Sequence, residues 1–580
     1  FDVIIGNPPW EKVEFQEKEF FITKSEDIAN AQNKAERGDL INQLKDENTQ
    51  LYEDFEKAKR RSENRGKFFR DSGRYPLTGK GDLNYYHLFA EHDRKSINVN
   101  GRVGIVIASG IATDYYSRDF FQDLIKNKQL VSLYDFENSN GLFPEVHKSF
   151  KFSLLTLTGN NLPEQQAEFA FFLTKLEHLR ISDRKFSLSA TDIELLNPNT
   201  ETCPTFKSEK DAALTKKIYD RNDILIEEKE DSQDKNPWGI RFLRMFDMAN
   251  DSNLFYDRDT IENKNRIGNL IKQGSEIRLP LYEGKMYDSY NSRAADITLS
   301  ENNIKRKGQS SYLTEQELQD PSRLPEPRYW VDSSEVKNEI SQSDAPYGYL
   351  SYKAVTSPTN RRTLIATQLP RVSVSHNTPL ILTDSSPSQE ICLLVNLNSY
   401  VLDYVIRNKA DTTFLSFFYI KQAASPGPDD YTPELRKEIV PKALELIYTG
   451  WDLVNFADYV WADASDPLQK AIKQQWDENV QETNGGNTDA EAPGWVETVR
   501  SSGGPHIPHL PFKYDESRRL DIKAELNAIV ANIYDIEYRE FEYILDTFSS
   551  VKRDQLDKYS EYRTKQLAMN YFEEYEDQSW

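Results

Sequence analysis

The sequence predicts an α/β fold over its first 165 residues, because short apolar runs of strand length alternate there with amphipathic helical patterns. The helical patterns, in which apolar side chains recur every three or four residues, span 85–95 and 118–127. This alternation is typical of a parallel sheet covered by helices, so we expect one domain over residues 1–165. The expected strands are residues 1–5, 103–108, 130–136 and 152–157.

The remaining sequence divides by pattern into an insertion and two further regions. Residues 12 to about 70 are dominated by Glu, Lys, Asp, Asn and Gln, which predicts a solvated helical insertion rather than a functional arm. Residues 166–425 mix short strands with turn signals and are expected to form a second, mixed α/β domain. Residues 426–580 are expected to be helical, with a mobile loop over about 482–508, which is rich in Gly, Pro, Asn and Ser.

Composition excludes several classes of protein. With 38% hydrophobic and 12% aromatic residues, the chain is typical of a folded protein rather than a disordered one. No apolar run approaches the roughly 18 residues that a membrane helix needs, so no membrane partner is expected. The two cysteines, Cys203 and Cys392, lack the spacing of a zinc site or a disulfide framework, which favours a reducing, cytoplasmic setting.

The charge balance limits how the chain can bind nucleic acid. There are 72 Lys and Arg residues against 94 Asp and Glu residues, a net charge of −22. A polyanion is attracted only where cations cluster, so any contact with DNA must be local. The chain also starts on an expected buried strand at Phe1 without an initiator Met, and we interpret it as a fragment of something longer.

The most informative stretch is Asn7-Pro8-Pro9-Trp10, which ends the first expected strand. The Asn7 side-chain oxygen and the Pro8 carbonyl are two fixed acceptors that can bind both protons of an exocyclic amine and orient its nitrogen for attack. Consecutive prolines fix the backbone and remove donors. Trp10 then offers a flat face on which a base extruded from a duplex can stack.

This tetrad resembles the NPP(Y/F/W) motif of DNA adenine-N6 methyltransferases, and further motifs follow in that family's order. The resemblance implies a Rossmann-like class I fold and S-adenosylmethionine as cofactor, with Asn7 and Pro9 beside it. Residues 81–89 resemble the motif whose aromatic, here Phe89, packs on the adenine of the cofactor. Residues 101–109 resemble the next glycine-led strand, although Ala108 replaces the family's proline. Residues 141–147 resemble the motif whose aromatic, here Phe143, stacks on the target base.

The family's glycine-rich cofactor loop has no match in this sequence. Residues 78–81 and 484–486 contain glycines but follow no apolar strand. The resemblance therefore implies that the chain holds the carboxyl-terminal half of the sheet. A missing N-terminal cofactor-binding segment or subunit would supply the other half. By itself the chain is not expected to methylate, and no metal is needed because a sulfonium is already an activated methyl donor.

Beyond residue 165 the sequence resembles large methyltransferases of the type IIG restriction-modification class and their BREX- and DISARM-like phage-defence relatives. In that family this region recognises double-stranded DNA, and other defence-system proteins are possible partners. The resemblance places residues 282–285 near the DNA or the catalytic cleft, and three arginines against phosphate or guanine. The expected DNA-binding residues are Tyr282, Lys285, Arg361, Arg362 and Arg371.

Two alternatives to a DNA adenine methyltransferase stay open. In the first alternative, the chain is a DNA-binding specificity module without catalysis. In the second, it belongs to a methyltransferase whose substrate amine is on RNA or on a protein glutamine. A nuclease is not expected, because Asp515 and the Asp521-Ile522-Lys523 run are spaced too closely for a PD-(D/E)xK site. His506 and His509 are separated by Pro508, which breaks any helix that would direct them at one metal.

Overall fold

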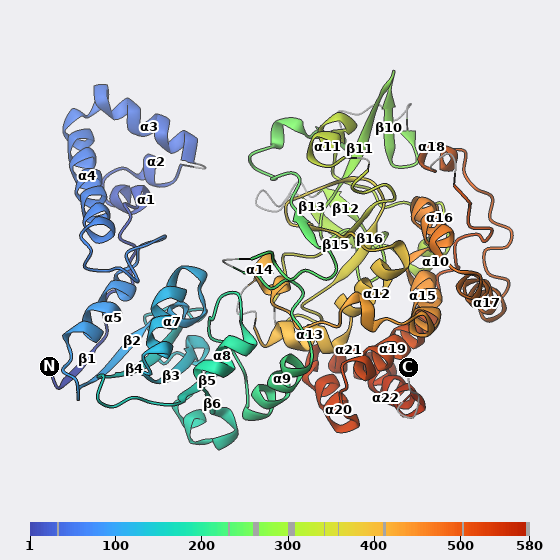
Figure 1. Ribbon diagram of the computed structural model, residues 1–580. Coiled ribbons are helices and arrows are strands. Elements are labelled where there is room, and N and C mark those ends of the chain that lie inside the picture. The colour runs from blue at the N-terminus through green and yellow to red at the C-terminus, as the bar shows by residue number, and fades with distance from the viewer. Residues whose placement is uncertain are drawn as a thin grey trace. The chain divides into compact units, whose positions relative to one another are not determined.

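The computed structural model describes residues 1–31, 34–229, 232–258, 266–299, 308–341, 343–357, 359–409, 413–500 and 504–575. The chain forms two compact units, residues 1–216 and 217–580, and the division falls within helix α9 (Glu209–Arg221). Figure 1 colours the first unit from blue to green and the second from green to red. None of the helices in these ranges has both the length and the apolar composition of a membrane span.

Unit 1 is built on a six-stranded mixed sheet in the order β1-β2-β4-β3-β5-β6. All four expected strands are confirmed. Strands β1, β2, β3 and β5 run in one direction, whereas β4 and β6 run in the other. The strands are β1 (Val3–Gly6), β2 (Arg102–Ile107), β3 (Leu130–Glu137), β4 (Lys151–Thr158), β5 (Ala167–Leu173) and β6 (Phe186–Leu188).

The sheet departs from a parallel arrangement at β4. A parallel neighbour needs a long crossover, usually a helix, but only residues 138–150 separate β3 from β4 and they contain no α-helix. The two strands therefore pair antiparallel, with Phe136 opposite Phe152. Strand β4 lies between β2 and β3, and Ile107 at the end of β2 is opposite Ser153.

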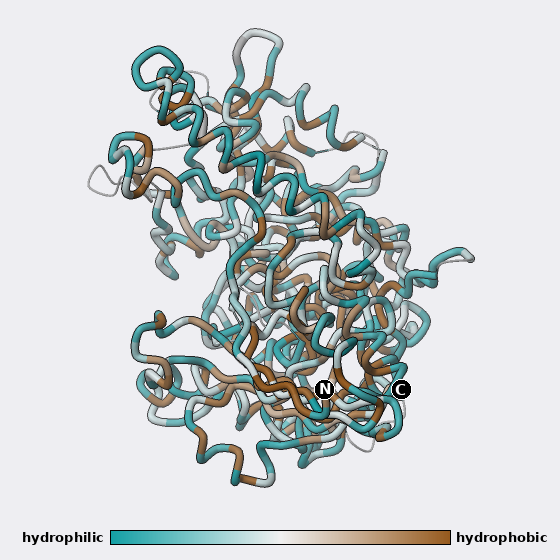
Figure 2. The backbone as a smooth tube through the Cα atoms, turned by 90° about the vertical axis from the view of Figure 1, so that its left-hand side faces the viewer, coloured by the Kyte–Doolittle hydropathy of each residue, from teal (hydrophilic) through white to brown (hydrophobic). Residues whose placement is uncertain are grey.

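Helices cover this sheet where the sequence predicts them. The expected helices over 85–95 and 118–127 are α5 (Tyr85–Ser96) and α7 (Arg118–Lys126), and short α6 (Gly110–Thr113) precedes α7. Helix α7 buries Phe120, Phe121 and Leu124. Strand β2 buries alternate residues and leaves the others half-buried, as expected for a strand within a sheet. In Figure 2 the tube beside the amino terminus is brown because these strands are apolar.

The insertion is helical and has a small core of its own. Its aromatic side chains pack together, with the rings of Phe21 and Phe55 stacked at 5.4 Å, and Ile28 and Ile41 are buried beside them. Figure 1 shows its helices standing apart from the sheet of unit 1. The helices are α1 (Glu17–Phe21), α2 (Glu26–Ala29), α3 (Lys34–Glu47) and α4 (Thr49–Asp71).

Unit 1 continues past residue 165, where the sequence predicts that the first domain ends. Strand β5 pairs parallel with β3, and β6 pairs antiparallel with β5, so both belong to the first sheet. Helix α8 (Ala190–Leu196), which a Ser189–Asp192 capping box begins, follows them. The further division at residue 425 stays a prediction.

Unit 2 begins with short strands in three sheets. The largest has the order β8-β14-β11-β10-β9, with β17 paired to β11; the others are β12-β13 and β16-β15-β18-β7. Their buried faces form one core that includes Tyr287, Val331, Tyr349 and Leu380. The strands are β7 (Arg241–Leu243), β8 (Tyr256–Asp257), β9 (Arg266–Ile267), β10 (Leu270–Gln273), β11 (Glu276–Tyr282), β12 (Ala295–Leu299), β13 (Gly308–Tyr312), β14 (Tyr329–Asp332), β15 (Tyr349–Tyr352), β16 (Ala366–Leu369), β17 (Ser373–Val374) and β18 (Leu380–Leu382).

The expected helical region begins earlier than residue 426. Helix α12 buries nine of its eleven residues, so it lacks the polar face by which an amphipathic helix is recognised in a sequence. Two short helices, α10 (Glu315–Gln319) and α11 (Ser333–Glu339), precede it. The helices are α12 (Pro387–Leu397), α13 (Tyr400–Arg407), α14 (Phe417–Lys421), α15 (Pro433–Ile447), α16 (Val454–Asp463), α17 (Asp466–Glu482), α18 (Val496–Val499), α19 (Glu516–Ile533), α20 (Tyr538–Thr547), α21 (Ser549–Tyr559) and α22 (Arg563–Tyr575).

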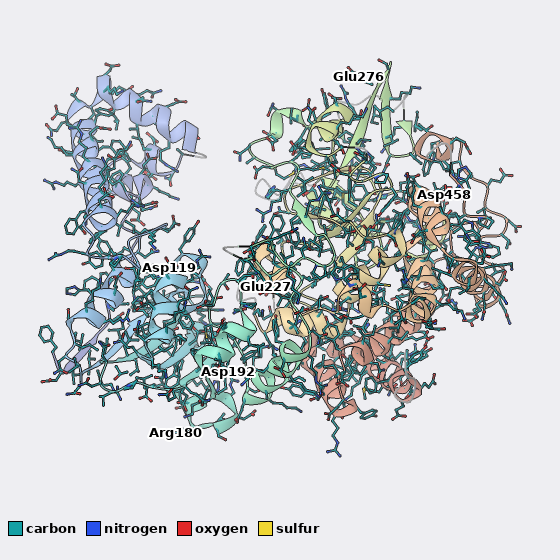
Figure 3. The ribbon with its side chains drawn as sticks, viewed as in Figure 1. Asp119, Arg180, Asp192, Glu227, Glu276 and Asp458 are labelled. Atoms are coloured by element: carbon teal, nitrogen blue, oxygen red, sulfur yellow. The ribbon has the colours of Figure 1, made fainter. Side chains whose placement is uncertain are left out.

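The expected mobile loop contains α18 and is attached to α16 by one carboxylate. Asp458, labelled in Figure 3, accepts hydrogen bonds from Arg500 Nε at 2.6 Å and from the Ile507 amide at 2.8 Å. The Nδ1 atom of His506 lies 2.9 Å from the same carboxylate. His509 instead stacks on Trp476, so the two histidines have separate partners. Residues 501–503 lie outside the described ranges, and the mobility of the loop stays a prediction.

A buried carboxyl in α12 makes the stability of the protein depend on pH. Glu390 accepts hydrogen bonds from Thr383 Oγ1 at 3.2 Å and Tyr347 OH at 3.3 Å, but its burial raises its pKa to about 7. Because this pKa exceeds the value of 4.5 in the unfolded chain, the stabilising contribution is complete below pH 4.5 and is lost as the pH rises through 7.

Glu390→Gln is therefore expected to stabilise the protein above pH 7, since the amide can accept the same bonds and never ionises. The gain at pH 8 should approach about 3 kcal/mol and nearly vanish at pH 4.5. Melting temperatures of both proteins from pH 4.5 to 8 measure it. The exposed Glu491→Gln is the matched control. A gain that is equal at both ends of the pH range would contradict the assignment.

Candidate active site and nucleic-acid interface

The candidate catalytic residues of unit 1 lie at one edge of its sheet. Strands β1, β2 and β3 share a direction, so the segments that follow them, beginning at Asn7, Ala108 and Asn138, leave from the same edge. In open α/β sheets, ligands bind outside the carboxyl ends of the strands. The topology therefore brings the Asn7–Trp10 tetrad and the loop containing Phe143 to the edge where a ligand site is expected.

The tetrad is held against the neighbouring strand by its last residue. Gly6 pairs with Ile105, and Trp10 Nε1 donates a hydrogen bond to the carbonyl of Val106 at 3.3 Å. Pro8 is buried, whereas Asn7 and Pro9 are exposed. The amide of Asn7 has no hydrogen-bond partner among the described residues. This amide is therefore available to a ligand, and its backbone is fixed on both sides.

Both predicted base-stacking residues pack around the same pair of aromatic rings. Phe136 and Phe152 stack at 5.3 Å, and Trp10 packs against the cluster that contains them. Phe143 contacts Phe152 edge to face at 4.9 Å and is 37% exposed. The cluster thus positions Trp10 and Phe143 while leaving part of each ring uncovered.

The loop that carries Phe143 is organised by Asn138, which the sequence analysis did not single out. The buried Asn138 donates Nδ2 hydrogen bonds to the carbonyls of Phe143 at 2.9 Å and Val146 at 2.8 Å. Its Oδ1 accepts from the Phe143 amide at 2.8 Å. An Asn just past a strand end, followed by Gly141 at φ +70°, is a signal of such a loop.

Asn138→Ala is expected to release this loop, because three backbone groups lose their partner. We expect a loss of about 2–3 kcal/mol of stability and faster proteolysis within residues 139–147. Limited proteolysis with mapping of the cleavage sites measures the release. Asn140→Ala, which removes a single bond to the Thr174 carbonyl, is the control. Cleavage of both variants at the same rate would contradict the role of Asn138.

Phe89, the predicted contact of the cofactor, lies on the uncovered face of α5. Its neighbours Tyr86, Leu88 and Ala90 are buried, whereas Phe89 is 40% exposed. The buried His87 has its pKa lowered to about 4 by desolvation, so it is neutral at physiological pH. Phe89 is therefore available to a planar ligand, and His87 belongs to the packed side of the helix.

A buried carboxylate lies at the same sheet edge, and sequence reasoning missed it. Asp135, in β3, accepts hydrogen bonds from Ser153 Oγ at 3.0 Å and from Ser109 Oγ. Ser109 follows Ala108, the position where the sequence departs from the family's proline. Burial, with the nearby Asp135, raises the pKa of the Cys203 thiol, which keeps it protonated. This cluster ties the ends of β2, β3 and β4 together beneath the edge.

The outer edge of β1 is free of any pairing strand among the described residues. In the sheet order β1 is terminal, with β2 as its neighbour. Val3 is 61% exposed and Ile5 is 84% exposed. Strands of parallel sheets are ordinarily buried on both faces, and exposed apolar edges are uncommon in folded proteins. The strand that carries the tetrad thus presents an apolar surface of the kind that another element usually covers.

Unit 2 contains a cavity of about 1040 Å³ that includes three of the predicted DNA-binding residues. Lys285, Arg361 and Arg362 all line it. Lys285 donates to the carbonyl of Gly308 at 2.7 Å and pairs with Glu283 at 3.1 Å. The Arg361 side chain is 63% exposed. The structure therefore brings Lys285 and Arg361 to one surface that a ligand can reach.

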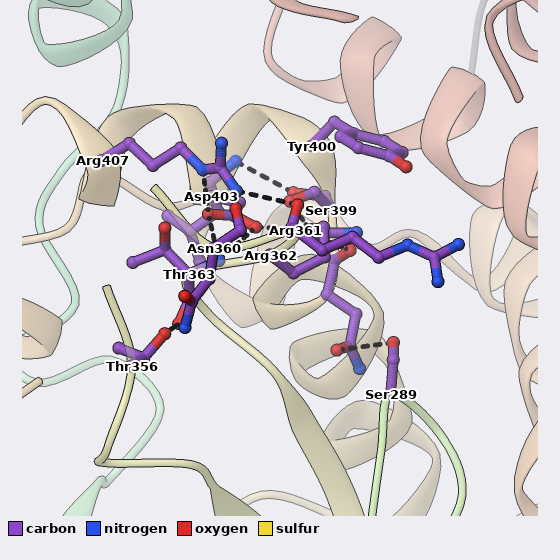
Figure 4. Close-up of polar contacts among 12 residues, drawn as sticks. Ser289, Thr356, Asn360, Arg361, Arg362, Thr363, Ser399, Tyr400, Asp403 and Arg407 are labelled. Carbon is purple, nitrogen blue, oxygen red and sulfur yellow. Dashed lines mark hydrogen bonds and ion pairs between the residues drawn. The ribbon is translucent and has the colours of Figure 1, made fainter. Parts of the chain in front are cut away.

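Arg362 has a structural role in the wall of this cavity. Its Nε pairs with the buried Asp403 at 2.5 Å, and Asp403 also pairs with Arg407 at 3.2 Å (Figure 4). Its Nη2 donates to the carbonyls of Asn398 at 2.6 Å and Ser399 at 3.0 Å. These bonds use the Nε and Nη2 donors of Arg362 and give it a structural role, and its contact with DNA stays a prediction.

One expected DNA contact, Tyr282, is corrected by its burial. Tyr282 is completely buried at the end of β11 and packs within the core of unit 2, so it has no surface with which to touch DNA. Arg371 donates to the backbone carbonyls of Ala345 at 2.8 Å and Ile340 at 3.3 Å, which fastens the end of α11. Its contact with DNA stays a prediction.

The acidic residues considered for a nuclease have structural partners. Asp515 caps α19 by accepting a hydrogen bond from the Arg518 amide at 2.8 Å. Asp521 accepts from Tyr571 OH at 2.8 Å. Lys523, the third member of that pattern, instead lines the cavity.

No family model matches the chain, and no curated protein matches it. The solved structures to which it is similar include restriction-modification enzymes with bound DNA. The type IIL enzyme MmeI in complex with DNA is 12% identical, with a TM-score of 0.34 over 83% of this chain and 53% of MmeI. The ATP-dependent type ISP enzyme LlaBIII, bound to DNA, is 10% identical, with a TM-score of 0.31 over 83% and 30%.

The type IIG restriction endonuclease BpuSI is 13% identical, with a TM-score of 0.25 over 72% of this chain and 51% of BpuSI. The chain thus spans about half or less of the length of these three proteins.

Proposed function

We propose that the chain carries the catalytic and target-recognition parts of a site-specific DNA methyltransferase. The substrate is the exocyclic amine of an adenine flipped out of duplex DNA, and the cofactor is S-adenosylmethionine. The observation that carries the proposal is the exposed Asn7 amide at the carboxyl end of β1, which has no hydrogen-bond partner among the described residues and lies beside two partly exposed aromatic residues. An enzyme of this kind acts in restriction-modification or phage defence, with other defence-system proteins as further partners.

The residues at the sheet edge fit the roles that this reaction needs. Asn7 Oδ1 and the Pro8 carbonyl accept hydrogen bonds from the two N–H groups of the amine and draw its nitrogen lone pair out of conjugation with the ring. Trp10 and Phe143 stack on the base and offset part of the cost of extruding it. Pro9 and Phe89 lie toward the cofactor. S-adenosylmethionine supplies an activated methyl group, so the protein contributes orientation and charge.

A second part of the proposal concerns the free edge of β1. We propose that a strand of another segment or subunit pairs with it and brings the cofactor-binding loop. Backbone donors and acceptors on that edge, together with the exposed Val3 and Ile5, are the surface that such a strand would cover. The assembled protein works in the cytoplasm, where the free, buried Cys203 and Cys392 stay reduced.

The alternative function is a DNA-specificity module without catalysis, or a split-gene subunit that needs an N-terminal partner. It is favoured by one observation, that the cationic cavity lies wholly within unit 2 and uses no residue of the tetrad. DNA binding by unit 2 is compatible with either function. Binding of S-adenosylmethionine is the property that separates them.

The test is to co-express the chain with the coding sequence directly upstream of Phe1. Calorimetry then measures S-adenosylmethionine binding by the chain alone and by the assembly, and single-molecule sequencing of host DNA detects methyladenine. We expect cofactor binding and methyladenine with the assembly only. If the assembly never binds the cofactor, the specificity-module function replaces this one. Methylation of RNA or a protein glutamine, with unmodified DNA, would contradict the adenine assignment.

A further inference from the structure

The cavity of unit 2 is strongly cationic for a chain whose net charge is −22. Its walls come from the segment after β11, from the segment after β15 and from helices α19 and α21. Its volume of about 1040 Å³ is at the upper end of the roughly 300–1,000 Å³ typical of small-molecule sites. Seven cationic side chains line it against four carboxylates, Glu283, Asp288, Glu516 and Asp554; the cations are Lys285, Lys353, Arg361, Arg362, Arg519, Lys523 and Lys558.

Most of these cations already have a partner within unit 2. Lys285 pairs with Glu283, Arg362 with Asp403, and Lys558 with Glu516 at 2.8 Å. Arg361 lies 3.9 Å from Asp554. Arg519 donates to the carbonyl of Leu446 at 2.7 Å. These ion pairs involve three of the four carboxylates that line the cavity. The fourth carboxylate is Asp288.

The side-chain ammonium groups of Lys353 and Lys523 have neither a hydrogen bond nor an ion pair within the described part of the chain. Both are half-buried, and the Lys523 ammonium lies 5.8 Å from the ring centre of Tyr290. Asp288 lines the same cavity and is the carboxylate that interacts electrostatically with both lysines. One carboxylate facing two ammonium groups leaves a half-buried positive charge without compensation, which is unfavourable unless an anion binds.

The protonation equilibria of the three groups agree with this geometry. Burial opposes ionisation of Asp288, but Lys353 and Lys523 together hold its pKa below the usual value. Burial, and then Arg519, lower the pKa of Lys523 to about 7. Burial lowers the pKa of Lys353, and Asp288 offsets part of that shift. The cavity thus holds ammonium groups that lack the counter-charge needed to restore their ordinary pKa.

We propose that Lys353 and Lys523 form a phosphate-binding subsite in this cavity. An ammonium group binds phosphate as a compact point charge with rotatable donors. Asp288 lies beside both lysines, and Arg361 and Arg519 supply further positive charge around the cavity. That the phosphate belongs to the backbone of DNA rests on the proposed function; the cavity itself selects a phosphate group of any nucleotide.

The experiment uses the full chain and four lysine variants. Lys353→Gln and Lys523→Gln remove one charge each, Lys523→Arg keeps the charge, and Lys470→Gln changes an exposed lysine of α17 as the matched control. Fluorescence anisotropy with a duplex oligonucleotide, repeated over a range of salt concentrations, gives the affinity and its salt dependence. Thermal unfolding with and without inorganic phosphate, at constant ionic strength, measures binding of the anion alone.

We expect Lys353→Gln and Lys523→Gln each to lose about tenfold in DNA affinity and to lower the salt slope by about one. Lys523→Arg and Lys470→Gln should keep the slope of the parent. Phosphate should raise the melting temperature of the parent and not that of Lys523→Gln.

Two outcomes separate this inference from the proposed function. If the chain binds DNA but Lys353→Gln and Lys523→Gln both keep the parent's affinity and slope, the subsite is overturned while DNA binding stands. If the chain binds no DNA but phosphate stabilises the parent and neither Lys353→Gln nor Lys523→Gln, the subsite stands with a free nucleotide as its ligand. If phosphate stabilises no protein and DNA does not bind, the subsite is overturned.

Discussion

Replacement of Asn7 by alanine is expected to abolish methylation by the assembled enzyme and to leave its DNA affinity within about tenfold. The variant loses the acceptor that orients the amine, and removal of one such preorganised group costs about 10²–10³-fold in rate. DNA affinity should persist because Asn7 contacts one extruded base at most. Single-turnover methylation of a duplex substrate, together with its dissociation constant, measures both effects.

The control for this prediction is Asn161→Ala, which changes an exposed asparagine in the turn between β4 and β5. It should keep the parent's rate. The fold is not expected to change in Asn7→Ala, because the Asn7 side chain has no partner among the residues that the structure describes. Full activity of Asn7→Ala would remove Asn7 from the mechanism and leave the tetrad as a strand-ending turn.

The second large effect is expected from Ile5→Lys, at the free edge of β1. Ile5 is 84% exposed, so the substitution should leave the fold of the chain unchanged. If another element covers β1, the substitution places an unpaired charge in an apolar interface. Association with the segment proposed to pair with β1 should weaken by at least about 10²-fold, and cofactor binding should be lost with it.

Co-purification of the two parts and calorimetry with S-adenosylmethionine measure this loss. Ile22→Lys is the matched control, since Ile22 is 60% exposed but lies in the helical insertion. Equal association of both variants with the upstream segment would show that β1 is not the joining surface. It would leave the assignment of Asn7 unaffected.

Strand positions in unit 1 could be read from the sequence because each is a short apolar run. Their order could not, because β4 inserts between β2 and β3 through contacts such as Ile107 opposite Ser153 that no local pattern encodes. The same holds for α12, whose burial on all sides removes the amphipathic signal. The spacing of apolar residues along a helix or strand indicates which of its faces are buried. It says little about which other element packs against those faces.

The candidate site divides in the same way. Asn7 and Trp10 are adjacent in the sequence, so their motif is visible without a structure. The structural role of Arg362 could not be predicted, because its partner Asp403 lies 41 residues away. Lys353 and Lys523 were missed because they are 170 residues apart and meet only in the folded unit, although a lysine within the apolar run at 349–355 is a local irregularity.

The helical insertion enters and leaves unit 1 at almost the same point. The Val13 amide donates to the carbonyl of Leu83 at 2.8 Å, and the Tyr85 amide donates to the carbonyl of Glu11 at 3.2 Å. Lys12 and Asn84 are paired between them. Since these contacts fix both ends, a change in the length of the roughly seventy residues between them is expected to shift neither Trp10 on one side nor α5 on the other.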